Sequence, residues 1–257
     1  MPARKKRIPA RVSGTGGEPA RAEAVQSVLT WLKRHSSKAT RDGMARYGIP
    51  SDNAFGVTMA NMKVLAKQLG RDHDLAAALW DTGWYEARML TSFVDDPARV
   101  TSAQMDRWCR DFDNWGICDT VCFHLFDRTP HAWAKVARWS GKQEEFVKRA
   151  AFALLWGLTV HDKRADDAQF LLGLGLIERA ASDERHLVKK AVNMALRAVG
   201  KRSPALNDAA VTVARRLADS TEATPRWVGK DALRELTSPA IVRRLAARPR
   251  AIGKRTG

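Results

Sequence analysis

The sequence contains little that would place the protein in a membrane or in an oxidising compartment. It has no uninterrupted apolar run of roughly 18 residues, and its first residues lack the apolar stretch of a signal peptide. It has three cysteines, Cys109, Cys118 and Cys122, an odd number without the spacing of a disulfide scaffold. We therefore expect a cytoplasmic protein with no membrane partner.

Several catalytic motifs are missing as well. The sequence has no Gly-rich phosphate loop of the form G-x-x-x-x-G-K-[ST], and its six histidines do not form H-E-x-x-H. Cys118 and Cys122 lie close to His124, which makes a zinc site conceivable, but the paired short-spaced ligands of structural zinc sites are lacking. Because free cysteine usually behaves as a small core residue, we expect buried thiols, no metal and no cofactor.

Acidic residues are also scarce relative to basic ones. The chain has 28 Asp and Glu against 44 Lys and Arg, which gives a formal net charge of +16 at pH 7. This excess is larger than solubility requires, so it favours a polyanionic partner, with nucleic acid ahead of a membrane surface. The alternative is a merely solvated basic surface, because charge alone identifies no ligand.

The 257 residues are enough for one large domain or a continuous repeat array. Residues 1–20 combine a basic cluster with Pro, Gly, Ser and Thr and predict a disordered basic tail. Residues 246–257 carry only basic charges, are interrupted by Pro249 and Gly253, and predict a second tail. The folded domain is therefore expected over residues 21–245.

Helical periodicity predicts an all-α fold between the tails, since period-two alternation and Asn-Gly hairpin signals are lacking. Three segments resemble one another, "FVKRAAFALLW", "LVKKAVNMALRAVG" and "WVGKDALREL". Their valines, Val147, Val188 and Val228, lie 41 and 40 residues apart. This spacing is typical of HEAT- or armadillo-type repeats and predicts a right-handed α-solenoid with a concave, basic binding face.

One helix row in the second of these segments carries three cations. Lys190, Met194, Arg197 and Lys201 follow the spacing i, i+4, i+7 and i+11, and Lys230 and Arg234 repeat the arrangement one segment later. Such a row repels itself unless an anion lies along it. A phosphate track is the favoured interpretation, and a solvated helix face is the alternative.

The segment "FDNWGICDTVC" places a tryptophan and an acid one helical turn apart. Asp113 or Asn114 is a good N-cap, so the helix is expected to begin at Trp115. Ile117, Val121 and Leu125 are expected to form a core row, and Trp115, Asp119 and Cys122 lie on nearly the opposite side of the helix. Trp115 and Asp119 are therefore expected to face away from this core row. A packed Trp and an Asp paired with an Arg would be the ordinary fate of such residues.

Taken in order, six segments resemble the DNA alkylation repair family, the HEAT-like glycosylases of the AlkD type. They are "YGIPSDNAFG", "WYEARML", "FDNWGICDTVC", "FVKRAAFALLW", "LVKKAVNMALRAVGKRSPAL" and "RWVGKDALREL", and they cover nearly everything between the tails. The resemblance implies a monomeric enzyme that cleaves the N-glycosidic bond of purines alkylated at N3 or N7 in duplex DNA, without flipping the base.

The resemblance also implies roles for individual residues. Trp115 and Asp119 match the Trp and Asp that approach the damaged nucleotide's sugar, and Arg149 matches a catalytic-site Arg. We expect the remaining contacts to DNA from Tyr47, an aromatic near the lesion, from Arg197 on the backbone, and from Lys148, Lys190, Met194, Lys201, Lys230 and Arg234.

One position departs from the family. Where its best-known members carry a second Trp, this sequence has Met194, which offers apolar contact and a polarizable sulfur but no indole face for a cation. Because of this departure, a second prediction stays open, namely a catalytically inactive HEAT-like protein that binds distorted or branched DNA. A protein-binding solenoid would leave the cationic row unexplained.

Overall fold

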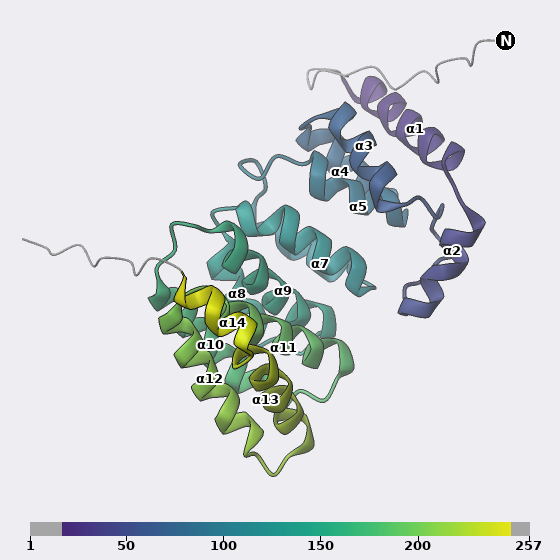
Figure 1. Ribbon diagram of the computed structural model, residues 1–257. Helices are drawn as coiled ribbons and strands as arrows, with labels where there is room; N and C mark the ends of the chain where they lie inside the picture. Colours follow the sequence, from purple (N-terminus) through teal and green to yellow (C-terminus); the bar gives the residue numbers. More distant parts are fainter. Residues whose placement is uncertain (1–16, 248–257) are drawn as a thin grey trace, which may run out of the picture. The chain divides into compact units, whose positions relative to one another are not determined.

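The computed structural model describes residues 17–247, and every regular element in that range is a helix (Figure 1). The all-α prediction is therefore confirmed for this part of the chain. The predicted tails lie mostly outside the described residues, although Glu18 to Ala20 open the first helix and Ala246 ends the last. The chain divides into two compact units, with the boundary between Ala132 and Trp133.

The first unit is organised around helix α5. This helix packs against α1, α3, α4 and α7, and it is buried along most of its length, from Glu86 to Val94. The elements of this unit are α1 (Glu18–Arg34), α2 (Lys38–Met44), η1 (Ala45–Tyr47), α3 (Met59–Leu69), α4 (His73–Asp81), α5 (Tyr85–Val94), α6 (Ser102–Arg110), α7 (Trp115–His124) and η2 (Phe126–Arg128).

Aromatic side chains fill the core of the first unit. Trp80 and Trp108 are fully buried and stack with ring centroids 4.2 Å apart, and the edge of Phe112 meets Trp80 at 6.0 Å. The indole N–H of Trp80 donates to a carboxylate oxygen of Asp111 at 2.8 Å, which satisfies a donor that burial would otherwise leave costly. These tryptophans are packing residues.

The second unit is built from two rows of helices. Helix α11 packs against both α9 and α13, and α10 packs against α12 (Figure 1). The elements are α8 (Ala132–Ser140), α9 (Glu145–His161), α10 (Asp167–Ala180), α11 (His186–Gly200), α12 (Pro204–Ala218), α13 (Ala223–Leu236) and α14 (Pro239–Ala246). The three segments that resemble one another in sequence thus form the row α9, α11 and α13.

The repeat register read from the valines is confirmed by burial. Val147 and Val188 are the third residues of α9 and α11, Val228 is the sixth residue of α13, and all three are buried. The period of about 40 residues is therefore the period of the packed helix pairs, as in HEAT-type repeats.

The cysteines are free thiols in the core of the first unit. Cys109, Cys118 and Cys122 are all buried, which confirms the expected packing role. Within residues 17–247 we find no group of three or more His, Cys, Asp or Glu side chains placed to hold a metal ion. Over the same residues, no helix is both long and apolar enough to cross a membrane.

Helices α12 and α13 approach each other closely at Gly229. A Cβ atom at this position would lie 2.3 Å from the backbone nitrogen of Ala218 and 2.5 Å from the carbonyl oxygen of Ala214. Only glycine fits without moving α12, because the atoms in the way belong to backbone. By contrast, a Cβ at Gly175 on α10 would meet the Arg179 side chain at an ordinary 3.6 Å.

We predict that Gly229→Ala lowers the free energy of unfolding by about 2 to 3 kcal/mol, since overpacking outweighs the gain in helix propensity. Gly175→Ala in the same unit is the matched control and should be neutral or stabilising by up to about 1 kcal/mol. Urea unfolding followed by circular dichroism measures both. Equal stability of the two variants would contradict the close approach.

Candidate functional site

Helix α7 begins where the sequence predicts. The side chain of Asn114 accepts a hydrogen bond from the amide N–H of Ile117 at 2.9 Å, so Asn114 is the N-cap and Trp115 the first helical residue. Ile117 and Val121 are buried, as predicted for the core row. Trp115 and Asp119 are both only half-buried, one turn apart, so neither belongs to the closed core.

Cys122 lies nearly opposite the row of Ile117 and Val121 in helical phase, yet it is fully buried, as expected for the thiols. The reason is that α7 buries two adjacent rows, one through Ile117 and Val121 and one through Cys118 and Cys122. Burial raises the pKa of the Cys122 thiol well above its ordinary value, and the neighbouring Cys118 adds to the effect.

A backbone carbonyl holds the indole of Trp115 in place. Tyr47 is the last residue of η1, and its carbonyl oxygen accepts a hydrogen bond from the Trp115 indole N–H at 2.7 Å. Carbonyls at a helix end lack intrahelical partners, which makes this one available. The side chain of Tyr47 is 67% exposed. The structure therefore brings together three predicted site residues, Tyr47, Trp115 and Asp119.

The loop that follows Tyr47 is anchored by a buried carboxylate. Glu86 of α5 is fully buried and accepts hydrogen bonds from the amide N–H groups of Phe55, Gly56 and Val57 at 2.9, 2.7 and 3.0 Å. Gly56 has a φ of +79°, and a Cβ there would lie 2.2 Å from the carbonyl oxygen of Ser37. Sequence reasoning missed Glu86, because an acid inside "WYEARML" reads as an ordinary helix-surface residue.

The start of α7 also rests on α5. A Cβ at Gly116 would lie 2.9 Å from the hydroxyl of Tyr85 and 3.3 Å from Cδ1 of Ile49. Burial raises the pKa of Tyr85 to about 12, with Glu86 and Asp113 adding to the effect, so the hydroxyl stays neutral. Glycine beside Trp115 therefore lets the helix approach α5 and the loop closely. This role could have been inferred only from the packing partners.

In the second unit, Lys148 and Arg149 are already occupied by protein partners. Lys148 Nζ lies 3.0 Å from a carboxylate oxygen of Asp183, which also receives the guanidinium of Arg185 at 2.6 Å. Arg149 is only 5% exposed. Its guanidinium donates to the carbonyl oxygen of Leu187 at 2.6 Å, a contact that joins α9 to α11.

The cations of α11 share one face, as predicted, but an acid already lies along part of it. Arg197 and Lys201 donate to the two carboxylate oxygens of Glu235 on α13, at 2.8 and 2.7 Å. Partial burial acts to raise the pKa of Glu235, but the hydrogen bond from Lys201 and the charges of Lys201 and Arg197 outweigh it and leave the pKa below its ordinary value. The anion that this row requires is thus partly supplied by the protein itself.

At the other end of the row, Lys190 contacts an aromatic ring. Its Nζ lies 4.7 Å from the ring centroid of Trp227 on α13, and that of Lys189 lies 5.2 Å from the same centroid. Lys190 is exposed, and Met194, one turn further on, is half-buried. The sequence pattern did not predict Trp227 as a partner of Lys190, because the periodicity of α11 does not show which helix lies beside it.

Helix α13 carries the last two predicted cations. Lys230 is exposed. Arg234 forms an ion pair with Asp231 on its own helix, and Asp231 also accepts a hydrogen bond from the side-chain amide of Asn193 on α11 at 2.7 Å. The predicted cations of the second unit therefore differ in availability. Lys190 and Lys230 face solvent, whereas Lys148, Arg197, Lys201 and Arg234 have acidic partners.

The ion pairs around Asp183 should make part of the stability depend on pH. The hydrogen bond from Arg185 lowers the pKa of Asp183 from 3.8 to about 2, with Lys148 contributing, so the charged form is favoured in the folded state. This stabilisation is present above pH 3.8 and is lost as the pH falls toward 2. When the pH is lowered from 3.8 to 2, we predict that the free energy of unfolding falls by about 1 kcal/mol less in Asp183→Asn than in the wild type, because the variant has no carboxylate to protonate. Urea unfolding at a series of pH values measures this difference. The control is Asp208→Asn, which removes an exposed acid of α12 and should show the same pH dependence as the wild type.

Removing Glu235 should make the cations of α11 available. We predict that Glu235→Gln strengthens binding of duplex DNA several-fold and steepens its salt dependence by about one to two units of log K against log salt. Lys190→Ala should have the opposite effect and flatten the slope by about one unit. Fluorescence anisotropy of a labelled duplex over a salt series tests both. An unchanged slope for both variants would mean that DNA does not contact this face.

The chain matches the DNA alkylation repair enzyme family over residues 28–236. One similar solved structure is described as a new family of proteins related to the HEAT-like repeat DNA glycosylases with affinity for branched DNA structures. It has a TM-score of 0.69 and 20% sequence identity, over 82% of this chain and 95% of that one, which shows a shared fold. No curated protein matches the chain. Since the family match spans most of the sequence, from α1 to the end of α13, the chain belongs to the DNA alkylation repair enzyme family.

Proposed function

We propose that the protein is a DNA glycosylase that excises N3- or N7-alkylated purines from duplex DNA, acting as a monomer and without a cofactor. The observation that supports this best is the pair Trp115 and Asp119 on α7. Both side chains are half-buried on the same side of the helix, and the Trp115 indole is held by the Tyr47 carbonyl. An acid and an indole face are thus presented next to an exposed tyrosine.

One carboxylate is sufficient for this reaction. Most glycosidases need a second carboxyl group to protonate a poor leaving group. A purine alkylated at N3 or N7 already carries a positive charge, so it leaves as a neutral base when the N-glycosidic bond breaks. The positive charge then moves to the sugar as an oxocarbenium-like state, which Asp119 would stabilise until water adds at the same carbon and gives up a proton to the solvent. Such preorganised stabilisation contributes a few kcal/mol, about 10²- to 10³-fold in rate.

The fixed indole of Trp115 suits recognition of a cationic base. A cation over an indole face gains about 0.5 to 2 kcal/mol, depending on how far water is excluded. The hydrogen bond to the Tyr47 carbonyl sets the ring orientation before DNA arrives, so no ordering cost is added on binding. The neutral purines of undamaged DNA would lack this contribution. Recognition of charge therefore gives a physical basis for preferring the alkylated base.

The basic groups of the second unit would hold the DNA backbone. Lys190 and Lys230 are exposed on adjacent helices and can reach phosphates directly. Arg149 would contribute only after its guanidinium leaves the carbonyl of Leu187. Arg197 and Lys201 would likewise have to exchange Glu235 for a phosphate. We expect binding to depend first on the two exposed lysines.

A second candidate function is recognition of branched or distorted DNA without base excision. It is favoured by Met194, which leaves α11 without an indole at that position, and by the burial of Arg149. The described solved structure, with its affinity for branched DNA, has a similar fold. This candidate shares the basic surface of the first and differs from it in requiring nothing of Asp119.

The experiment that separates the two is base release from duplex DNA carrying N7-methylguanine or N3-methyladenine. We predict that Asp119→Asn slows release by about 10²- to 10³-fold while leaving duplex affinity within a factor of a few. Asp113→Asn is the matched control, because Asp113 is exposed, precedes the same helix and carries the same charge. It should release base at the wild-type rate.

Met194→Trp restores an indole on α11 and should raise the rate of release if the absent ring limits recognition. Release that does not depend on Asp119 would refute the mechanism. Tight binding of branched duplexes by a wild-type protein that releases no base from either lesion would favour the second candidate.

A further inference from the structure

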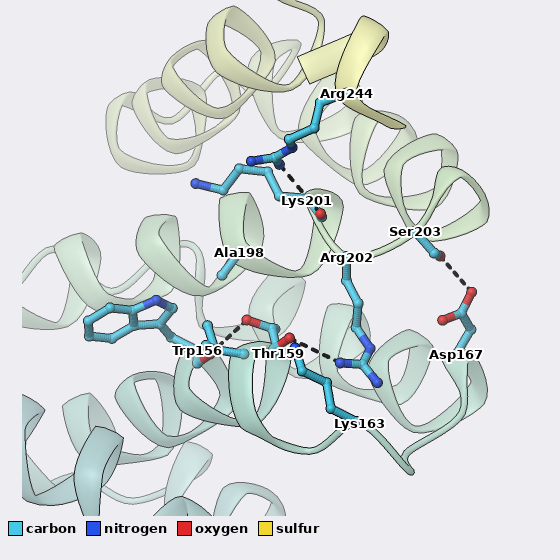
Figure 2. A pocket seen from close by; sticks show the side chains of 10 residues that line it. Trp156, Thr159, Lys163, Asp167, Ala198, Lys201, Arg202, Ser203 and Arg244 are labelled. Atoms are coloured by element: carbon cyan, nitrogen blue, oxygen red, sulfur yellow. Dashed lines mark hydrogen bonds between the residues drawn. The ribbon is translucent and has the colours of Figure 1, made fainter. Parts of the chain in front are cut away.

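A pocket of about 580 Å³ lies within the second unit, and no step of the proposed excision uses it. It is formed by the C-terminal ends of α9 and α11 with the turns that follow them, by the first residue of α10, and by α14 (Figure 2). This volume is within the range of about 300 to 1,000 Å³ that is typical of small-molecule sites. The pocket therefore has the size to accept a ligand about as large as a nucleotide.

The charged groups of the pocket are mainly cationic. Its single lining carboxylate, Asp167, accepts a hydrogen bond from the Ser203 hydroxyl at 2.6 Å. Figure 2 shows this pair on one side of the pocket, with two of the cations above it. The lining cations are Lys163, Lys201, Arg202 and Arg244. The pocket thus favours an anion.

Arg202 is a fixed positive charge in the wall. Its guanidinium donates to the carbonyl oxygens of Thr159, Asp162 and Ala165 at 3.0, 2.8 and 2.8 Å, and it lies 4.2 Å from the ring centroid of Phe170. Carbonyls and a ring hold the group in position, and the nearby carboxylate of Asp162 balances part of its charge. The guanidinium is therefore a preorganised group of the wall and does not depend on a flexible side chain.

Two further cations face solvent at the rim. Lys163 and Arg244 are exposed, and neither forms an ion pair with any acid among residues 17–247. Arg244 reaches only the carbonyl oxygen of Lys201, at 3.5 Å (Figure 2). Lys201, by contrast, is already paired with Glu235. Lys163 and Arg244 are consequently the side chains that can close on a phosphate.

The remaining wall is apolar and contains an indole. Trp156 on α9 is half-buried and lines the pocket together with Val160 and Ala198. Figure 2 shows Trp156 and Ala198 on the side away from Ser203 and Asp167. An aromatic face beside a cluster of cations is the combination that binds single-stranded nucleic acid, because bases stack on the ring while phosphates meet the charges. A phosphate alone would leave the apolar wall unused.

We propose that this pocket binds one unpaired nucleotide of a DNA strand, with its base against Trp156 and its phosphate between Lys163 and Arg244. A base within a duplex would first have to be unpaired and extruded at a cost of about a few kcal/mol, so the pocket favours a nucleotide of a single-stranded extension or a junction. The proposal rests on the proposed DNA binding and adds a second contact to it. It predicts that the protein prefers DNA in which duplex and single strand meet.

The test compares two double variants with the same charge change. Lys163→Glu/Arg244→Glu alters the pocket, whereas Arg164→Glu/Arg243→Glu alters exposed neighbours that do not line it. Fluorescence anisotropy measures binding of a blunt duplex, of the same duplex with a single-stranded extension, and of the isolated short strand. We expect the wild type to bind the extended duplex about tenfold more tightly than the blunt one. The pocket variant should lose this preference, and the control should keep it.

An abasic extension tests the base contact, because it offers phosphates without rings and should lose most of the preference. Equal binding of blunt and extended duplexes by the wild type, or the same loss in both double variants, would overturn the proposal. These outcomes are distinct from failure of the proposed function. Base release without a preference for extensions refutes the pocket alone, whereas pocket-dependent binding of the single strand without base release refutes only the excision.

Discussion

The buried carboxylate of Glu86 is the contact on which the candidate site of the first unit depends. It accepts three successive amide N–H groups and so fixes a loop that has no regular structure of its own. That loop follows the Tyr47 carbonyl, which in turn orients Trp115. Charge-assisted hydrogen bonds are about twice as strong as neutral ones, and a buried carboxylate left without its donors would be costly. The indole is therefore placed through the central helix α5 as well as through α7.

The sequence was sufficient for the features that follow from periodicity and capping. It predicted that α7 starts at Trp115, that Ile117 and Val121 are buried, and that α9, α11 and α13 repeat. It was not sufficient for features that depend on which helix lies next to which. Cys122 is buried by a second row of contacts, Arg149 by the approach of α11, and Glu86 has partners some 30 residues away in the chain. Helical phase gives the direction of a side chain but not what it meets.

The basic surface of the second unit is less uniform than the net charge implies. Within α11 and α13, Glu235 and Asp231 neutralise Arg197, Lys201 and Arg234, while Lys190 and Lys230 remain exposed. Paired and exposed cations have different roles in binding a polyanion. An exposed lysine gains a phosphate by releasing counterions, whereas a paired arginine must exchange one protein anion for one DNA anion. The net charge of +16 therefore overstates the number of groups ready to bind.

The hydrogen bond between Trp115 and Tyr47 uses the main chain of Tyr47 and not its phenol ring. Every residue type, proline included, has this backbone carbonyl. Position 47 can therefore exchange its side chain without releasing the indole. A substitution at position 47 can therefore change the size of the side chain exposed beside Trp115, and so the shape of the surface that faces the DNA. The orientation of the Trp115 ring stays the same.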